Sequence, residues 1–247
     1  MYKKNSDYSN LIRLNKYLAN AGFCSRRKAD AYIQLGLIKM NGVTVTKLGE
    51  KISCTDNITF CNSPIRFEKK VYIILNKPKN CITTTYDPQG RFTVMDFFKK
   101  KCKERIFPVG RLDRNTTGVL LLTNDGVLSE KLTHPKYKKK KIYHVWLNRK
   151  ISIADMNKLS KCIKLNDGIF YVDSISYINN NEDKTKVCIE IHSGQSHIVR
   201  RIFGNLDYRV LSLDRVYFDG LTKKNLKKGE WRFLSKKEIT MLLYKNY

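Results

Sequence analysis

The stretch GRLDRNTTGVLLLTNDG, Gly110 to Gly126, places one aspartate between two arginines in a loop that runs directly into a continuous apolar segment. The apolar segment, residues 118–123, is typical of a strand buried on both faces of a sheet or of a buried helix turn. A second strand candidate, residues 105–112, precedes the loop. Asp113 is therefore predicted at the end of a sheet, where a rigid support can hold a functional carboxylate.

The two neighbouring arginines, Arg111 and Arg114, leave more than one interpretation of Asp113 open. A guanidinium beside a carboxylate favours its ionised form, which suits a nucleophile or a base and not a general acid. Alternatively, Asp113 caps a turn and pairs with a surface arginine. A metal-dependent nuclease that uses Asp113 and Asp125 is a further possibility, but the sequence offers no third carboxylate at a convincing spacing.

Composition indicates a globular protein with an anionic partner. The chain has 247 residues, of which 42% are hydrophobic, enough to bury one large or two modest domains. Lysine and arginine total 48 against 22 aspartates and glutamates, so the formal net charge is +26. Such an excess favours nucleic acid as the partner. An AT-rich genome also produces a bias toward lysine, so the charge alone does not establish that the partner is a nucleic acid.

Cysteine usage and hydropathy favour the cytoplasm. The seven cysteines are scattered, with no Cys-x-x-Cys pair and no histidine at zinc spacing. The sequence has no basic start followed by an apolar run, and no run reaches the ~18 apolar residues of a membrane span. We therefore expect a cytoplasmic protein with reduced cysteines.

The beginning of the chain predicts a small unit of two helices and a hairpin. The first helix has apolar residues at helical spacing and ends at Gly22; these residues are Leu11, Leu14, Leu18 and Ala21. Ser25 is the N-cap candidate of a second helix over residues 26–35, and Gly36 ends it. Asn41-Gly42 then lies between two alternating β-rich runs, as in a two-residue hairpin turn.

Three cations, Arg26, Arg27 and Lys28, occupy the first turn of the second helix. This placement opposes the helix dipole, which favours acidic residues there. Cations beside free amide N–H groups suit a phosphate, and broken local rules tend to mark functional sites. The alternative is an ordinary solvated basic face.

From Val71 the pattern changes to a larger mixed domain. Further strands are expected over residues 71–76, 138–147 and 187–193, and a helix over residues 196–206. Tyr171 and Tyr177, on a period-two pattern, are expected in the core. The fold class predicted for the chain is α+β, with a small helix-helix-hairpin domain followed by a larger, mainly antiparallel-sheet domain.

Across nearly its whole length the chain resembles the ribosomal small- and large-subunit pseudouridine synthase family. GRLDRNTTGVLLLTNDG is similar to the catalytic signature of that family, and residues 13–45 resemble the alpha-L RNA-binding motif that usually precedes it. LNKPKN, KIYHV, GQSHIVRR and the closing segment from Leu211 are similar to its other conserved segments. The resemblance implies a flexible arm over residues 1–10, an RNA-binding domain over 11–68 and a catalytic domain over 69–247.

The resemblance also assigns roles residue by residue. Asp113 matches the catalytic nucleophile, Tyr143 matches the tyrosine that lies against the target base, and Arg200 matches the basic residue that pairs with the aspartate. Leu213 matches a leucine beside the nucleophile, and Ile198 stands where many relatives carry glutamine. Further substrate contacts are expected from Arg111, His197 and Arg201. RNA-backbone contacts are expected from Arg26, Arg27, Lys28, Lys138, Lys139, Lys140 and Lys141.

The implied reaction isomerises uridine to pseudouridine in ribosomal RNA, with the large subunit favoured by the closing segment. Because the reaction is redox-neutral and consumes no water, we expect no cofactor and no metal. Ribosomal RNA is the expected partner, without a membrane, and the protein is expected to be a monomer. The alternative function is that of a non-catalytic ribosome-assembly or RNA-binding protein.

Overall fold

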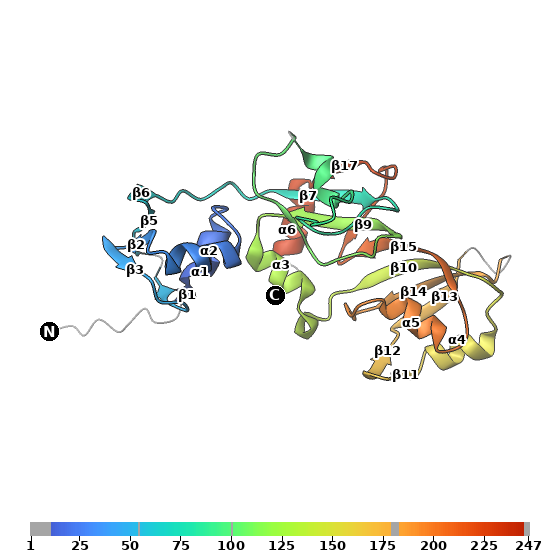
Figure 1. The fold of residues 1–247 in the computed structure, drawn as a ribbon. Helices are drawn as coiled ribbons and strands as arrows, with labels where there is room; N and C mark the ends of the chain where they lie inside the picture. Colours follow the sequence, from blue (N-terminus) through green and yellow to red (C-terminus); the bar gives the residue numbers. More distant parts are fainter. Residues whose placement is uncertain (1–10, 54, 100, 179–182, 245–247) are drawn as a thin grey trace. The chain divides into compact units, whose positions relative to one another are not determined.

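The computed structural model describes residues 11–53, 55–99, 101–178 and 183–244 (Figure 1). The expected flexible arm, residues 1–10, lies outside the described residues. The chain divides into two compact units. Unit 1 is made of residues 1–70, 103–105 and 124–126, and unit 2 holds the remainder.

Unit 1 contains the two expected helices. Helix α1 is Leu14–Asn20 and helix α2 is Arg26–Gln34. The backbone N–H of Lys28 donates to Ser25 Oγ at 3.2 Å, so the predicted N-cap of α2 is confirmed. The core of the unit consists of Leu14, Leu18, Cys24, Ala29, Ile33, Ile38, Val45, Ile52 and Ile58. The apolar residues at helical spacing are therefore the ones that the two helices bury.

The predicted hairpin follows directly. Strands β2 (Ile38–Met40) and β3 (Val43–Val45) pair antiparallel. Asn41 and Gly42 connect them with φ of 52° and 85°, the left-handed values that this two-residue turn requires. The other strands of unit 1 are β1 (Ile12–Arg13), β4 (Lys51–Ile52), β5 (Ile58–Phe60) and β6 (Ser63–Pro64).

Unit 2 is built on one mixed sheet, whose strand order is β13-β14-β10-β15-β9-β7-β17, with β16 on β15 and β8 on β9 (Figure 1). β9 and β15 pair in parallel, and the other pairs in this sheet are antiparallel. The strands are β7 (Tyr72–Lys77), β8 (Phe107–Pro108), β9 (Thr116–Thr123), β10 (Lys141–Leu147), β13 (Ser174–Tyr177), β14 (Lys186–Ile191), β15 (Val210–Phe218), β16 (Leu221–Thr222) and β17 (Trp231–Phe233). The predicted fold class is confirmed.

Strand β9 forms the centre of this sheet and is buried at every position. Leu120 and Leu122 belong to one apolar cluster, and Val119 and Leu121 belong to a second. Because successive side chains of a strand point to opposite faces, these two clusters lie on the two faces of the sheet. The apolar segment of the opening stretch is therefore a strand buried on both sides.

Helices cover both faces. α5 (Ile198–Gly204) and the 3₁₀ helix η2 (Val94–Phe98) contribute to the first cluster. α3 (Gly126–Thr133) and α6 (Lys236–Tyr244) contribute to the second. The remaining elements are α4 (Ile153–Leu159), η3 (Pro135–Tyr137) and the hairpin of β11 (Cys162–Leu165) and β12 (Gly168–Tyr171). None of the helices within the described residues is long and apolar enough to cross a membrane.

Gly118 permits the parallel contact between β9 and β15. Its φ is 108°, and a Cβ built on it would lie 2.1 Å from the carbonyl oxygen of Arg215. Such a contact is far inside the van der Waals limit, so any larger residue would push β15 away from β9. This glycine therefore fixes the spacing of two central strands of unit 2.

Two expectations from the sequence are wrong in detail. The strand expected over residues 105–112 is reduced to Phe107–Pro108, because the chain turns away at Gly110, whose φ is 70°. Tyr171 is exposed instead of buried. Its strand, β12, pairs only with β11 in a two-stranded sheet among the described residues, so one of its faces points to solvent. Tyr177 does pack against the first cluster.

Candidate active site

Asp113 lies in the loop that leads from β8 into β9, and it lines a cavity of about 110 Å³ in unit 2. The backbone N–H of Thr116 donates to the carbonyl oxygen of Asp113 at 3.1 Å. The Thr116 hydroxyl donates to Asp113 Oδ2 at 3.3 Å. These two bonds close a turn at the first residue of β9 and hold the carboxylate at the start of that buried strand.

Two basic side chains from the region of α5 face the carboxylate of Asp113. His197 Nδ1 lies 3.2 Å from Asp113 Oδ2, and Arg200 Nε lies 3.8 Å from the same oxygen. Within the described parts of the chain, its sequence neighbours Arg111 and Arg114 are not among the ion-pair partners of this carboxylate. The basic side chains nearest to this carboxylate therefore come from a distant segment, although Arg111 does line the cavity.

His197 reaches Asp113 through an uncommon backbone conformation. It precedes α5 with φ of 53° and ψ of 20°, the left-handed region that few residues other than glycine adopt. Backbone strain of this kind persists where the surrounding structure holds it, often at functional sites. The strained residue here is one that contacts the candidate nucleophile.

Arg200 is held in place from its other side. Its Nη1 donates to the carbonyl oxygen of Val210 at 2.8 Å, which ties the guanidinium to the start of β15. The next residue, Arg201, instead pairs with Asp167 and does not line the cavity. The two adjacent arginines therefore have different partners: Arg200 faces Asp113, and Arg201 faces the β11–β12 hairpin.

Tyr143 and Leu213 complete the apolar part of the cavity. Tyr143 lies on β10 and is 8% exposed, and Leu213 lies on β15 and is 4% exposed. Leu213 pairs with Thr116 of β9, the residue that holds Asp113. The cavity therefore places an aromatic ring and an aliphatic side chain close to one carboxylate.

The lysine run before Tyr143 is not uniformly exposed, which corrects part of the expectation. Lys138 is exposed, and Lys140 is half-exposed and pairs with Glu190 at 2.7 Å. Lys139 is buried and pairs with Asp219 at 3.1 Å. Lys141 is also buried, and it lines the cavity. Burial leaves Lys139 and Lys141 unsuited to the RNA-backbone contacts expected of them.

Lys77, a buried lysine under the Asp113 loop, is a site residue that the sequence did not predict. This side chain is 0% exposed, and burial lowers its pKa to about 8. Its Nζ lies within 3.2 Å of four carbonyl oxygens, those of Pro78, Asp113, Arg114 and Thr116. Each such acceptor would cost about 1–3 kcal/mol if left unpaired in the interior. Lys77 therefore holds the backbone of the Asp113 loop. The sequence feature that could have indicated this role is a lysine at the end of an apolar strand.

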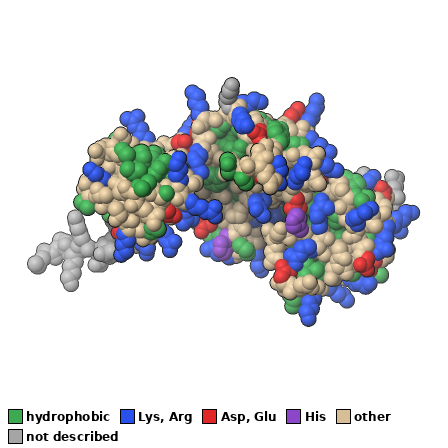
Figure 2. All heavy atoms as spheres, in the orientation of Figure 1, with side chains coloured by type: hydrophobic (Ala, Val, Ile, Leu, Met, Phe, Trp, Pro, Cys, Tyr) green, Lys and Arg blue, Asp and Glu red, His purple; other side chains and the backbone are tan. Residues whose placement is uncertain are grey.

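No group of three or more histidine, cysteine, aspartate or glutamate side chains able to hold a metal ion occurs among the residues that the structure describes. The cavity instead combines one carboxylate with the basic side chains of Arg111, Lys141, His197 and Arg215 and with the ring of Tyr143. Lysine and arginine side chains are also distributed over the face seen in Figure 2. A carboxylate and an aromatic ring in a cavity lined by basic side chains suit an enzyme that acts on a base of nucleic acid.

Comparisons with known proteins give the same class. The family model for RNA pseudouridylate synthase matches residues 71–205, and the model for the S4 domain matches residues 12–58. The chain therefore belongs to the RNA pseudouridine synthase family, and the resemblance seen in the sequence is confirmed. It is an enzyme that isomerises uridine to pseudouridine in RNA, and it carries an S4 RNA-binding domain.

Similar proteins extend over nearly the whole chain. An uncharacterised RNA pseudouridine synthase of Aquifex aeolicus is 37% identical, covering 94% of this chain and 93% of its own length. Ribosomal large subunit pseudouridine synthase B of Bacillus subtilis is 37% identical, covering 93% and 95%. A crystal structure of a pseudouridylate synthase matches with a TM-score of 0.67 and 29% identity, covering 94% of this chain and 99% of its own.

Proposed function

We propose that this chain converts one or more uridines of large-subunit ribosomal RNA to pseudouridine, with Asp113 as the nucleophile. The observation that carries the proposal is the Asp113 carboxylate, which faces His197 and Arg200 in a cavity shared with Tyr143. The choice of RNA is supported by the name of the Bacillus subtilis relative, ribosomal large subunit pseudouridine synthase B.

In the proposed reaction the target uridine leaves its stack and enters the cavity. Extrusion costs a few kcal/mol, which stacking on the Tyr143 ring partly offsets. Asp113 attacks the nucleotide as an anion, and the Arg200 guanidinium stabilises that anion. The bond that this attack forms between Asp113 and the nucleotide breaks again before the product leaves, which regenerates the free carboxylate. The N1–C1′ bond breaks, the ring turns, C5 bonds to C1′, and the hydrogen on C5 is lost while N1 gains a proton. Leu213 and Arg111 line the cavity beside the ring.

The alternative, a non-catalytic RNA-binding protein, predicts no change in the RNA. The proposal is tested by mapping pseudouridine in large- and small-subunit ribosomal RNA of cells with and without this gene. At least one position of the large-subunit RNA should lose pseudouridine without the gene and regain it when the wild-type gene is returned. An unchanged map of both RNAs would contradict the proposal and favour the alternative.

RNA binding by residues 11–68, ahead of a catalytic domain over residues 69–247, is part of the proposal. Arg26, Arg27 and Lys28 are all exposed in the first turn of α2. Their charges lie beside backbone N–H groups of the helix start, and this combination attracts phosphate. Location in the cytoplasm and action as a monomer also belong to the proposal.

Replacing Arg26, Arg27 and Lys28 together by glutamine should weaken binding to unmodified large-subunit RNA and reduce its salt dependence. Each phosphate that a cation no longer neutralises reduces the magnitude of the slope of log affinity against log salt by ~0.7–0.9, so removal of all three cations should make the slope shallower by ~2.1–2.7. Titrations of labelled RNA at several salt concentrations measure this slope.

A matched control removes three exposed lysines elsewhere, Lys228, Lys236 and Lys237. The control should change the slope by less than half as much as the α2 variant. Equal changes in both variants would mean that overall charge, and not the start of α2, determines the contact with the RNA backbone.

A further inference from the structure

Arg215 is a buried arginine in the wall of the cavity, and the proposed reaction of Asp113 and Tyr143 does not use it. It lies on β15 directly opposite Tyr143 of β10 in the antiparallel register. Directly opposite residues of two paired strands point to the same face of a sheet. Both side chains line the cavity with Asp113, and Arg215 is only 2% exposed. The pairing therefore places Arg215 next to Tyr143, the residue expected to stack on the base, on the cavity side of the sheet.

The Nη2 atom of Arg215 is a buried hydrogen-bond donor that the described part of the protein does not satisfy. Its Nε donates to the carbonyl oxygen of Val119 at 2.8 Å, and its guanidinium carbon lies 4.6 Å from the centre of the Phe218 ring. Its Nη2 is buried and has no hydrogen-bond partner in the described structure. A buried donor to which nothing is bound costs about 1–3 kcal/mol, so such a group is expected to meet an acceptor in the occupied state.

The charge of Arg215 is also unbalanced. Among the residues that the structure describes, no carboxylate lies within 4.0 Å of its guanidinium, and the adjacent Asp214 pairs with Lys223 instead. Lys141 lines the same cavity and is held by the carbonyl oxygens of Lys139 and His192 at 2.9 and 2.8 Å. Burial and the charge of Arg215 lower the pKa of Lys141 to about 8. Two cations thus share one wall of the cavity.

We propose that Arg215 is a further catalytic residue, whose Nη2 donates a hydrogen bond to a carbonyl oxygen of the uracil ring bound against Tyr143. The inference rests on the proposed function, because it takes uridine as the occupant of the cavity. Uracil carries two carbonyl oxygens, which are acceptors of the kind that the buried donor lacks. Lys141 adds positive charge to the same wall.

The chemistry gives this hydrogen bond a role in the rate. When the N1–C1′ bond breaks, its electron pair stays on the ring, which becomes an anion with charge spread over N1 and the two carbonyl oxygens. A fixed guanidinium at one of these oxygens stabilises the anion more than the neutral base. The stabilisation ends when C5 bonds to C1′, the hydrogen on C5 leaves as a proton and N1 takes up a proton. Arg215 itself neither gains nor loses a proton in this sequence.

The test is a cycle of protein and substrate changes measured by single-turnover release of tritium from C5 of uridine. The substrate is a fragment of large-subunit RNA that contains the mapped uridine, made with uridine, 2-thiouridine or 4-thiouridine at that position. Wild-type protein is compared with Arg215→Met. If the methionine variant does not fold, Arg215→Lys replaces it, because lysine keeps the positive charge but lacks the planar guanidinium group. Sulfur is a weaker acceptor than oxygen, so it removes the proposed bond from the substrate side.

We expect Arg215→Met to lower the rate at least about ten-fold, because the bond joins a charged donor to a developing anion. Its affinity for the RNA should stay within about two-fold of wild type, because phosphate contacts dominate that affinity. One of the two thio substitutions should slow the wild type about ten-fold more than it slows the Arg215 variants. Arg209→Met, an exposed arginine outside the cavity lining, should behave as wild type.

An Arg215 that only ties β15 to β9 and packs on Phe218 gives a different result. Both thio substitutions would then change the rates of wild type and variants by equal factors, and this outcome would overturn the inference. Wild-type release of tritium is measured in the same assay. Its absence on the mapped fragment would contradict the proposed function itself, so the two failures are distinguishable.

Discussion

Replacing Asp113 by asparagine is expected to abolish isomerisation while leaving folding and RNA affinity intact. The amide keeps the shape of the side chain and can still accept from the Thr116 hydroxyl, but it removes the negative charge that makes an attack possible. Loss of a nucleophile typically costs a factor of more than about 10⁴ in rate. Single-turnover tritium release from large-subunit RNA measures the loss, and RNA titration and circular dichroism measure what is retained.

Asp207→Asn is the matched control, because Asp207 is exposed and lies outside the cavity lining. It should turn over at the wild-type rate. A pure Asp113→Asn protein that still released tritium at a rate within about ten-fold of wild type would exclude Asp113 as nucleophile. The alternative interpretation of Asp113, as a structural turn residue, would then remain.

The second large effect is expected at Tyr143, where one side chain can serve as a stacking surface and as a proton carrier. Tyr143→Phe keeps the ring, so RNA binding should be retained, while loss of the hydroxyl should slow the chemical step by about 10²–10⁴-fold. Tyr143→Ala removes both the ring and the hydroxyl. Stacking is worth ~1–3 kcal/mol per base, so capture of the extruded uridine should weaken about ten-fold or more in addition.

Single-turnover rates over a range of enzyme concentrations separate capture from chemistry for these variants. Tyr171→Ala is the control, because Tyr171 is exposed on β12 and does not line the cavity. A phenylalanine variant with the wild-type rate would show that the hydroxyl is dispensable and that Tyr143 is only a platform. Wild-type behaviour of the alanine variant would remove Tyr143 from the site.

The features that the sequence predicted well are those that depend on near neighbours in the chain. The Ser25 cap of α2 needs only an oxygen three residues before an amide. The Asn41-Gly42 turn needs only two residues that accept positive φ. The buried strand β9 shows itself by a continuous apolar run. The signature around Asp113 allowed predictions beyond near neighbours, because a family resemblance carries information about residues far apart in the chain.

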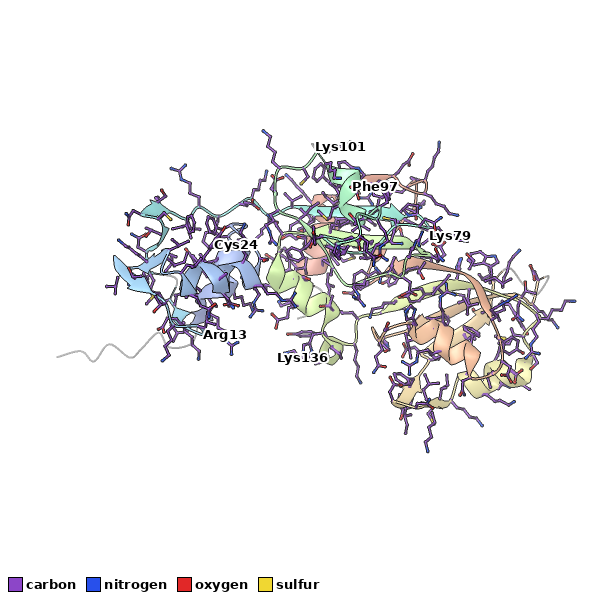
Figure 3. All side chains as sticks on the ribbon, in the orientation of Figure 1. Arg13, Cys24, Lys79, Phe97, Lys101 and Lys136 are labelled. Carbon is purple, nitrogen blue, oxygen red and sulfur yellow. The ribbon has the colours of Figure 1, made fainter. Side chains whose placement is uncertain are left out.

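The sequence did not predict the exposure of residues whose burial depends on contacts with distant segments of the chain. Tyr171 follows a strand pattern, but its strand pairs with β11 alone in the described structure, so its face stays open to solvent. Lys139 belongs to a run that looks solvated, but the end of β15 brings Asp219 within 3.1 Å of it. By contrast, Lys79, labelled in Figure 3, follows β7 and is exposed as a surface lysine should be.

The sequence by itself determined the fold class, the start of α2, the hairpin turn, the buried central strand and, through resemblance, the residues assigned to the reaction. The tertiary structure alone decided which charges meet. It brought Lys77 to the carbonyl oxygens of the Asp113 loop and His197 and Arg200 to the Asp113 carboxylate. It also placed Arg215 opposite Tyr143 on two paired strands. The physical reason is that capping, turns and apolar periodicity act between near neighbours, whereas ion pairs and buried hydrogen bonds join segments that only the pairing of distant strands brings together.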